Sequence, residues 1–141
     1  MEMAVNRMIG YRLKRLDRLI DDTFDRLLAD TGLSRRQWQV LNTLSRTACD
    51  DEQLDEALRP FWDGGAETVA DVVDELGRRG WLADDGGRHA LTEAGRTAHA
   101  AAGDRVAGIR ALMSEGVTAE EFQATMEVLQ RMADNLAAAR R

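Results

Sequence analysis

The sequence has few of the residues on which many function classes depend. Its 141 residues include one cysteine, one proline and one tyrosine, and aromatic residues make up only 5% of the chain. A single cysteine, Cys49, rules out an internal disulfide framework and a zinc site made of cysteines alone. These absences exclude the small disulfide-stabilised domains of secreted proteins and favour a reducing compartment.

Long apolar runs and positive charge are also scarce. No run approaches the roughly 20 residues that span a bilayer, and the first residues lack the pattern of a secretory signal, so we expect a cytoplasmic protein with no membrane partner. The net charge is −6, and Lys14 is the only lysine. This charge argues against nonspecific binding to nucleic acid or anionic membranes, because releasing counterions from phosphates requires concentrated positive charge. A local cluster of basic residues would still allow binding to phosphates despite the negative net charge.

Motifs for catalysis are missing too. The sequence has no glycine-rich phosphate loop, no nucleophile elbow and no paired-histidine zinc helix. His89 and His99 are the only histidines, and they lack the close spacing of metal ligands. Cys49 lies in a polar loop beside Asp50 and Asp51, whose charges disfavour the reactive thiolate. We therefore expect no enzyme, no metal site, no cofactor and no redox switch.

Apolar residues spaced by three and four predict a series of helices. The first helix carries one stripe and ends at Asp30-Thr31-Gly32, because glycine readily closes a helix. Ser34 and Gln37 form a capping-box pattern for a second helix that begins near Arg35. A polar stretch then precedes a third helix, which Pro60 punctuates. The three stripes are Val5, Ile9, Leu13, Leu16, Ile20, Phe24 and Leu27; Trp38, Leu41 and Leu44; and Leu54, Ala57, Leu58 and Phe61.

A fourth helix is predicted after the turn Asp63-Gly64-Gly65. Its apolar stripe is Val69, Val72, Val73 and Leu76, and Gly80 ends it, which makes it the candidate recognition helix. Segments 81–83 and 88–91 then flank Asp85-Gly86-Gly87, a sequence suited to a tight hairpin. The order of these elements predicts a winged helix-turn-helix, which is mostly α with a small β-hairpin wing (α+β).

Two further helices complete the chain. An alanine-rich helix runs from Thr92 toward Met113, and Thr118 with Glu121 forms a capping box for a last helix with apolar residues at 122, 126, 129, 132 and 136. The terminal helices carry more apolar surface than a small module covers, so we expect a two-fold dimer. We predict one compact domain with an N-terminal dimerisation helix (1–32), a winged helix-turn-helix (33–96) and C-terminal dimerisation helices (97–141).

Three segments in this order resemble the MarR family of bacterial transcriptional regulators. They are GLSRRQWQVL at 32–41, TVADVVDEL with RGWL at 68–76 and 79–82, and LTEAGR at 91–96. The resemblance implies a homodimer, most simply a repressor, whose recognition helices enter successive major grooves of a palindromic double-stranded operator. It also implies release from DNA by a small aromatic ligand bound between the dimerisation helices and the winged module.

The expected DNA contacts combine the recognition helix with the nearby cations. They are Arg35, Arg36, Glu67, Thr68, Ala70, Asp71, Arg78 and Arg88. Segment 50–75 departs from a DNA-binding surface, because it holds ten acids against Arg59 alone. The acids could accept from cytosine N4, but affinity must come from the arginines. Alternatively, Asp71, Asp74 and Glu75 pair with Arg78 and Arg79 as ordinary helix support.

The candidate ligand-binding residues are Tyr11, Arg12, Trp38 and Trp62. An aromatic wall with a guanidinium would orient an aromatic carboxylate, whereas the alternative is ordinary packing with a surface arginine. A second function also stays open. A MarR-like dimer that has lost operator binding would serve as a protein-interaction or small-molecule module through its acidic face.

Overall fold

The computed structural model describes residues 2–59, 62 and 67–140, with side chains from Met8 onward. The chain forms two compact units, residues 1–107 and residues 108–141. The predictions for Pro60, Phe61 and Asp63–Gly65, and for the Val5 side chain, lie outside this description. None of the described helices combines the length and apolar character that crossing a membrane requires.

The first helix, α1, spans Glu2–Leu27. A single 3-10 turn, η1 (Ala29–Thr31), follows it, and Gly32 closes the turn with a φ of 72°, a conformation that favours glycine. The predicted end of the first helix is therefore confirmed. Phe24 and Leu28 pack in the core, while Leu13 and Leu16, earlier on the same stripe, are about half exposed at 45% and 47%.

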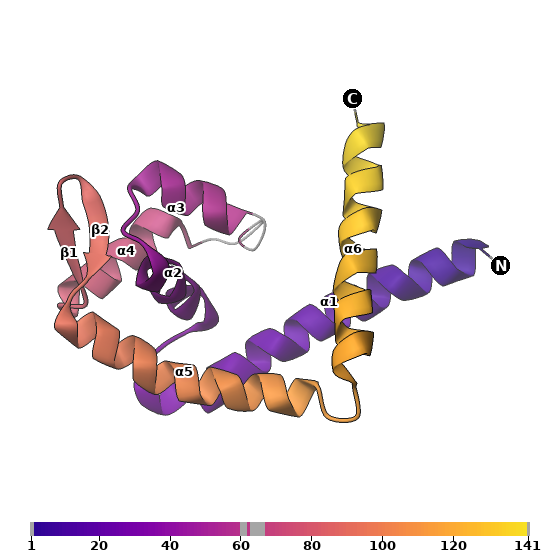
Figure 1. Ribbon diagram of the computed structural model, residues 1–141, viewed down its shortest axis with the longest axis horizontal. Helices are drawn as coiled ribbons and strands as arrows, with labels where there is room; N and C mark the ends of the chain where they lie inside the picture. The colour runs from indigo at the N-terminus through magenta and orange to yellow at the C-terminus, as the bar shows by residue number, and fades with distance from the viewer. Residues whose placement is uncertain (1, 60–61, 63–66, 141) are drawn as a thin grey trace. The chain divides into compact units, whose positions relative to one another are not determined.

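Three short helices follow, and each begins with the same device. They are α2 (Arg35–Arg46), α3 (Asp51–Leu58) and α4 (Val69–Arg78), as Figure 1 shows. Ser34, Asp50 and Thr68 each accept a hydrogen bond from the backbone N–H three residues later, and the side chain there accepts one in return. These capping boxes satisfy donors that a helix start leaves free. The predicted box at Ser34 and Gln37 is confirmed.

The core of the first unit forms where these helices meet. The predicted stripes of the second and fourth helices are buried, as are Leu54 and Leu58 of α3. The largest fully enclosed side chains are Leu28, Val40, Leu41, Leu54, Val72 and Leu76. Burying an aliphatic side chain contributes about 1.5–3 kcal/mol, so this cluster holds α4 firmly against the rest of the unit.

The predicted wing is present as an antiparallel hairpin of β1 (Leu82–Asp85) and β2 (Arg88–Leu91). Gly86 and Gly87 form its turn with φ of 62° and 88°. Cys49, in the connection between α2 and α3, pairs with His89 through two backbone hydrogen bonds of 3.1 and 2.7 Å. This bridge attaches the wing to the connection that leads into α3.

Two long helices follow the wing, α5 (Glu93–Met113) and α6 (Ala119–Ala139). The capping box predicted at Thr118 and Glu121 is confirmed. None of the described residues of α6 is buried. Its exposed large apolar side chains are Phe122, Met126, Val128, Met132 and Leu136. The second unit therefore presents an apolar helix face without a covering element of its own.

Candidate nucleic-acid interface and ligand pocket

Helix α4 has one buried and one polar face. Because its four apolar side chains point into the core, the positions between them face outward. Ala70, Asp71, Asp74 and Arg78 are all exposed. The outward face of α4 is therefore exposed and largely polar, and a major groove is wide enough to admit an α-helix.

Two of the predicted DNA contacts also cap the helix. The Thr68 hydroxyl accepts a hydrogen bond from the Asp71 backbone N–H at 3.1 Å, and Asp71 Oδ2 accepts one from the Thr68 backbone N–H at 3.1 Å. Glu67, just before the cap, is exposed. The cap therefore fixes the Thr68 hydroxyl and the Asp71 carboxylate at the start of α4.

Glu75 holds two arginines at the end of α4. Its carboxylate lies 2.9 Å from Arg78 Nη2 and 3.3 Å from Arg79 Nε. The hydrogen bonds from Arg78 and then Arg79 lower the pKa of Glu75. The ion pairs with Arg78 and Arg79 that were considered as helix support are therefore made by Glu75. Asp71 instead takes part in the capping box with Thr68. Arg78 keeps 72% of its side chain exposed.

Arg79 is held on three sides. Besides contacting Glu75, it donates to the Gly32 carbonyl at 2.9 Å and lies 5.1 Å from the Trp81 ring centroid. It therefore connects α4 to the turn before α2 and to the start of the wing.

The two arginines at the start of α2 are engaged by the protein itself. Arg35 Nη1 contacts Asp17 at 2.9 Å and Asp21 at 2.8 Å, both on α1. Burial lowers the pKa of Arg35, but hydrogen bonds to Asp21 and Asp17 outweigh it and leave the pKa raised. The guanidinium is thus a charged link between α1 and α2.

Arg36 supports the segment that leads into α4. It donates to the Glu67 carbonyl at 2.7 Å and lies 4.8 Å from the Trp62 ring centroid. The Trp62 indole in turn donates to Gln39 Oε1 at 2.6 Å. The partners of Arg36 lie 26 and 31 positions away along the chain, which is why helix periodicity did not reveal these contacts.

The wing carries the other exposed cation. Arg88 is exposed and lies opposite Asp85 across the hairpin, while His89 lies opposite Asp84. His89 Nε2 also lies 2.6 Å from Asp51 Oδ1 at the start of α3. Among the predicted cations, Arg78 and Arg88 are therefore the most accessible to a phosphate.

Cys49 lies in the predicted connection between α2 and α3, and only 7% of it is exposed. Its pairing with His89 draws the connection against β2 and covers the side chain. Burial and then the Asp50 charge raise the pKa of Cys49, against a smaller opposing effect of Arg88. In the part of the chain that the structure describes, no three His, Cys, Asp or Glu side chains gather as metal ligands would.

The predicted ligand residues lie in different surroundings. Trp38 is buried and stacks on His99 with ring centroids 4.8 Å apart and planes at 3°. Tyr11 is 67% exposed on α1, where Arg12 is also exposed. Trp62 is half-buried over Arg36. None of the four lines the pocket that the structure shows.

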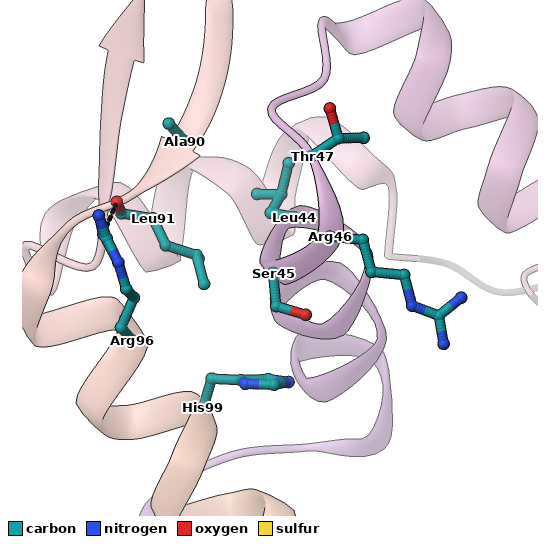
Figure 2. Close-up of a pocket in the computed structure, with 8 residues that line it drawn as sticks. All are labelled: Leu44, Ser45, Arg46, Thr47, Ala90, Leu91, Arg96 and His99. Atoms are coloured by element: carbon teal, nitrogen blue, oxygen red, sulfur yellow. Dashed lines mark hydrogen bonds between the residues drawn. The ribbon is translucent and has the colours of Figure 1, made fainter.

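That pocket opens between the end of α2, strand β2 and the start of α5, with a volume of about 510 Å³ (Figure 2). It is lined by Leu44, Ser45, Arg46, Thr47, Ala90, Leu91, Arg96 and His99. Its lining includes two arginines and a histidine but no acid. His99 Nε2 lies 3.1 Å from Asn42 Oδ1, and burial lowers the pKa of His99. The pocket size falls in the range of small-molecule sites.

No family model and no curated protein matches the sequence. The fold, however, is similar to solved structures. A MarR family transcriptional regulator from Silicibacter pomeroyi aligns with a TM-score of 0.79 at 21% identity, over 96% of this chain and 97% of that one. CouR from Rhodococcus jostii RHA1, bound to p-coumaroyl-CoA, aligns with a TM-score of 0.76 at 24% identity, over 89% of this chain and 91% of that one.

A third similar structure is a Mycobacterium tuberculosis MarR family protein in complex with DNA. It aligns with a TM-score of 0.68 at 20% identity, over 87% of this chain and 95% of that one. All three alignments span both the winged module and the flanking helices, since each covers more than four fifths of the chain. The chain therefore has the winged helix-turn-helix fold of the MarR family transcriptional regulators.

Proposed function

We propose that this protein is a DNA-binding transcriptional regulator of the MarR family, a cytoplasmic homodimer that represses by occupying a palindromic operator. The observation that carries the proposal is the exposed polar face of α4 beside the wing, in a fold shared with a regulator solved in complex with DNA. In such proteins a helix reads base edges in the major groove while the flanking elements contact phosphates.

Dimerisation is supported by the apolar surface outside the winged module. Five large apolar side chains of α6 and several of α1 are at least one third exposed. Such surface is rare on monomeric proteins and favours association through a self-complementary interface. Residues 1–32 and 97–141 would supply this interface, and residues 33–96 would meet DNA. A dimer also provides the two recognition helices that a palindrome requires.

Because segment 50–75 is acidic and repels phosphate, DNA affinity has to come from arginines. Arg35, Arg36 and Arg79 are held by intramolecular partners. Arg78, which pairs with Glu75 but keeps 72% of its side chain exposed, and the exposed Arg88 would therefore supply most phosphate contact. Few phosphate contacts predict a shallow dependence of affinity on salt. Asp71 Oδ1 and the Thr68 hydroxyl would contribute specificity rather than affinity.

A small aromatic effector would release the protein from DNA. CouR, which shares the fold, was solved with p-coumaroyl-CoA. An effector shifts such an equilibrium only by its difference in affinity for the two states.

Fluorescence titration against a duplex from the region upstream of its own gene tests the proposal. Measurements at two salt concentrations, with a scrambled duplex as competitor, should give specific binding that weakens with salt. Arg88→Gln should weaken binding to all sequences and reduce the slope of log affinity against log salt by about 2, because each of the two protomers loses one phosphate contact. Arg110→Gln, near the end of α5, is the matched charge control and should leave both unchanged.

The acidic surface also favours a second function. Exposed Glu52, Asp55 and Glu56 lie on α3, and Asp51 lies at its start. A dimer without operator binding would dock a basic protein through this surface. No binding to any upstream duplex at low salt, together with salt-sensitive binding of a basic protein, would contradict the regulator and support this module.

A further inference from the structure

We infer that Glu75 limits the affinity of this protein for DNA, because its carboxylate competes with a DNA phosphate for the guanidinium of Arg78. The inference rests on the proposed function and concerns a residue outside the predicted DNA contacts. It assigns to an acid of the recognition helix an effect on binding to every sequence, which differs from the reading of a base.

The geometry at the end of α4 places one carboxylate between two guanidinium groups. Arg78 and Arg79 follow Glu75 by three and four positions, so the three side chains share one side of the helix. Glu75 Oε2 lies 2.9 Å from Arg78 Nη2, and Glu75 Oε1 lies 3.3 Å from Arg79 Nε. Each oxygen of the carboxylate therefore accepts from a different arginine.

The two arginines differ in their access to solvent. Arg79 keeps only 29% of its side chain exposed and also donates to the Gly32 carbonyl at 2.9 Å, which fixes it against the protein. Arg78 is 72% exposed, and Glu75 is its only ion-pair partner among the residues that the structure describes. Arg79 thus keeps the carboxylate in place, and Arg78 is the member of the group that a phosphate can reach.

The charge of Glu75 opposes a phosphate at Arg78 in two ways. It shares a donor of the Arg78 guanidinium, and it repels an anion that approaches the same group. A guanidinium has five N–H donors, so Arg78 still binds a phosphate, but less tightly than it would alone. The partial negative charge at the end of α4 acts in the same direction.

Glu75 stays ionised when the protein binds DNA at neutral pH. The hydrogen bonds from Arg78 and then Arg79 lower the pKa of Glu75, so its negative charge is present throughout the neutral range. The two arginines and the one acid therefore carry a single net positive charge at this end of the recognition helix. Without the acid they would carry two.

The Glu75→Gln variant tests the inference, because glutamine keeps the length and an acceptor oxygen but removes the charge. Fluorescence titration compares a duplex from the upstream region with a scrambled duplex. Exposed ion pairs contribute little, so we expect about threefold tighter binding per protomer and roughly tenfold for a dimer. The gain should be equal for the two duplexes. A changed ratio between them would overturn the inference, because Glu75 would then be reading a base.

Asp74→Asn is the matched control. Asp74 is exposed on the same helix and forms no ion pair in the part of the chain that the structure describes. Both variants are also made with Arg78→Gln. In that background the gain from Glu75→Gln should fall to that from Asp74→Asn. A gain that persists without Arg78 would overturn the inference and indicate general charge repulsion. Weaker binding by Glu75→Gln would also overturn it and show that Glu75 orients Arg78 for DNA.

A measurement without DNA tests the ion pair itself. Carbon-13 NMR of the Glu75 carboxyl group should show that Arg78→Gln raises the pKa of Glu75 toward its ordinary value. An unchanged pKa would overturn the inference, since Arg78 would not be paired with Glu75 in solution. Duplex binding by the wild type without a gain in Glu75→Gln would overturn the inference alone. Binding of no duplex by either protein would contradict the proposed function together with the inference.

Discussion

The imidazole of His99 lies flat against the indole of Trp38, with ring centroids 4.8 Å apart and planes 3° from parallel. This stack joins α5 to α2 inside the winged unit. Its histidine also lines the pocket, so the packing of two helices and the electrostatics of the pocket depend on one side chain.

The first prediction concerns stability and pH. Burial lowers the pKa of His99, so the unfolded chain binds a proton at a higher pH than the folded protein does. The free energy of unfolding should therefore decline as pH falls through the ordinary histidine value of about 6.5. Urea unfolding between about pH 7.5 and about pH 5.5 measures this decline. The His99→Phe variant, which keeps an aromatic stack, should show a smaller decline in the free energy of unfolding. An identical decline in the wild type and the variant would contradict the prediction, because both proteins contain His89.

The second prediction concerns Gly95 at the start of α5. A Cβ there would collide with the backbone carbonyl of Trp81, which cannot move as a flexible side chain would. Gly95→Ala should lower the free energy of unfolding by about 2 kcal/mol, as overpacking does. Gly108→Ala on the same helix meets nothing within 4 Å and should instead raise it by up to about 1 kcal/mol. Equal effects of the two substitutions in urea unfolding would contradict the packing argument.

The third prediction concerns the reactivity of Cys49. Because burial and the nearby Asp50 raise the pKa of this thiol, little thiolate is present near neutral pH. The folded protein should react with a disulfide reagent much more slowly than the same protein in urea. The chain has one cysteine, so the absorbance of the thiolate released from the reagent reports on Cys49 alone. Rapid reaction of the folded protein would show that the bridge between Cys49 and His89 opens readily.

The fourth prediction concerns the α6 face that we assign to the dimer. Met126→Glu places a charge on the exposed apolar stripe and should shift the protein from dimer to monomer, because burying an unpaired charge is costly. Ala124→Glu adds the same charge two positions away, on a different side of the helix, and should leave the dimer intact. Sedimentation equilibrium of the two variants distinguishes these outcomes. An unchanged assembly in Met126→Glu would place the interface elsewhere.

The elements with local causes were predictable from the sequence. Ser34 with Gln37 and Thr118 with Glu121 start helices through bonds that span three residues. The φ values of Gly32, Gly86 and Gly87 likewise belong to turns that glycine alone enters easily. Apolar spacing also predicted the buried face of α4. Such features depend on neighbours in the chain, so one sequence contains the information that produces them.

Tertiary structure decided which side chains are exposed and which are engaged by other parts of the protein. Arg35 and Arg36 look like phosphate contacts in sequence, yet Asp17, Asp21, Glu67 and Trp62 engage them in the fold. Cys49 is covered because β2 pairs with it, 40 positions away along the chain. The pocket arises where α2, β2 and α5 meet, and no local pattern describes such a meeting. Helix starts and turns follow from bonds between neighbours, whereas burial, ion pairs and cavities follow from which distant segments pack together.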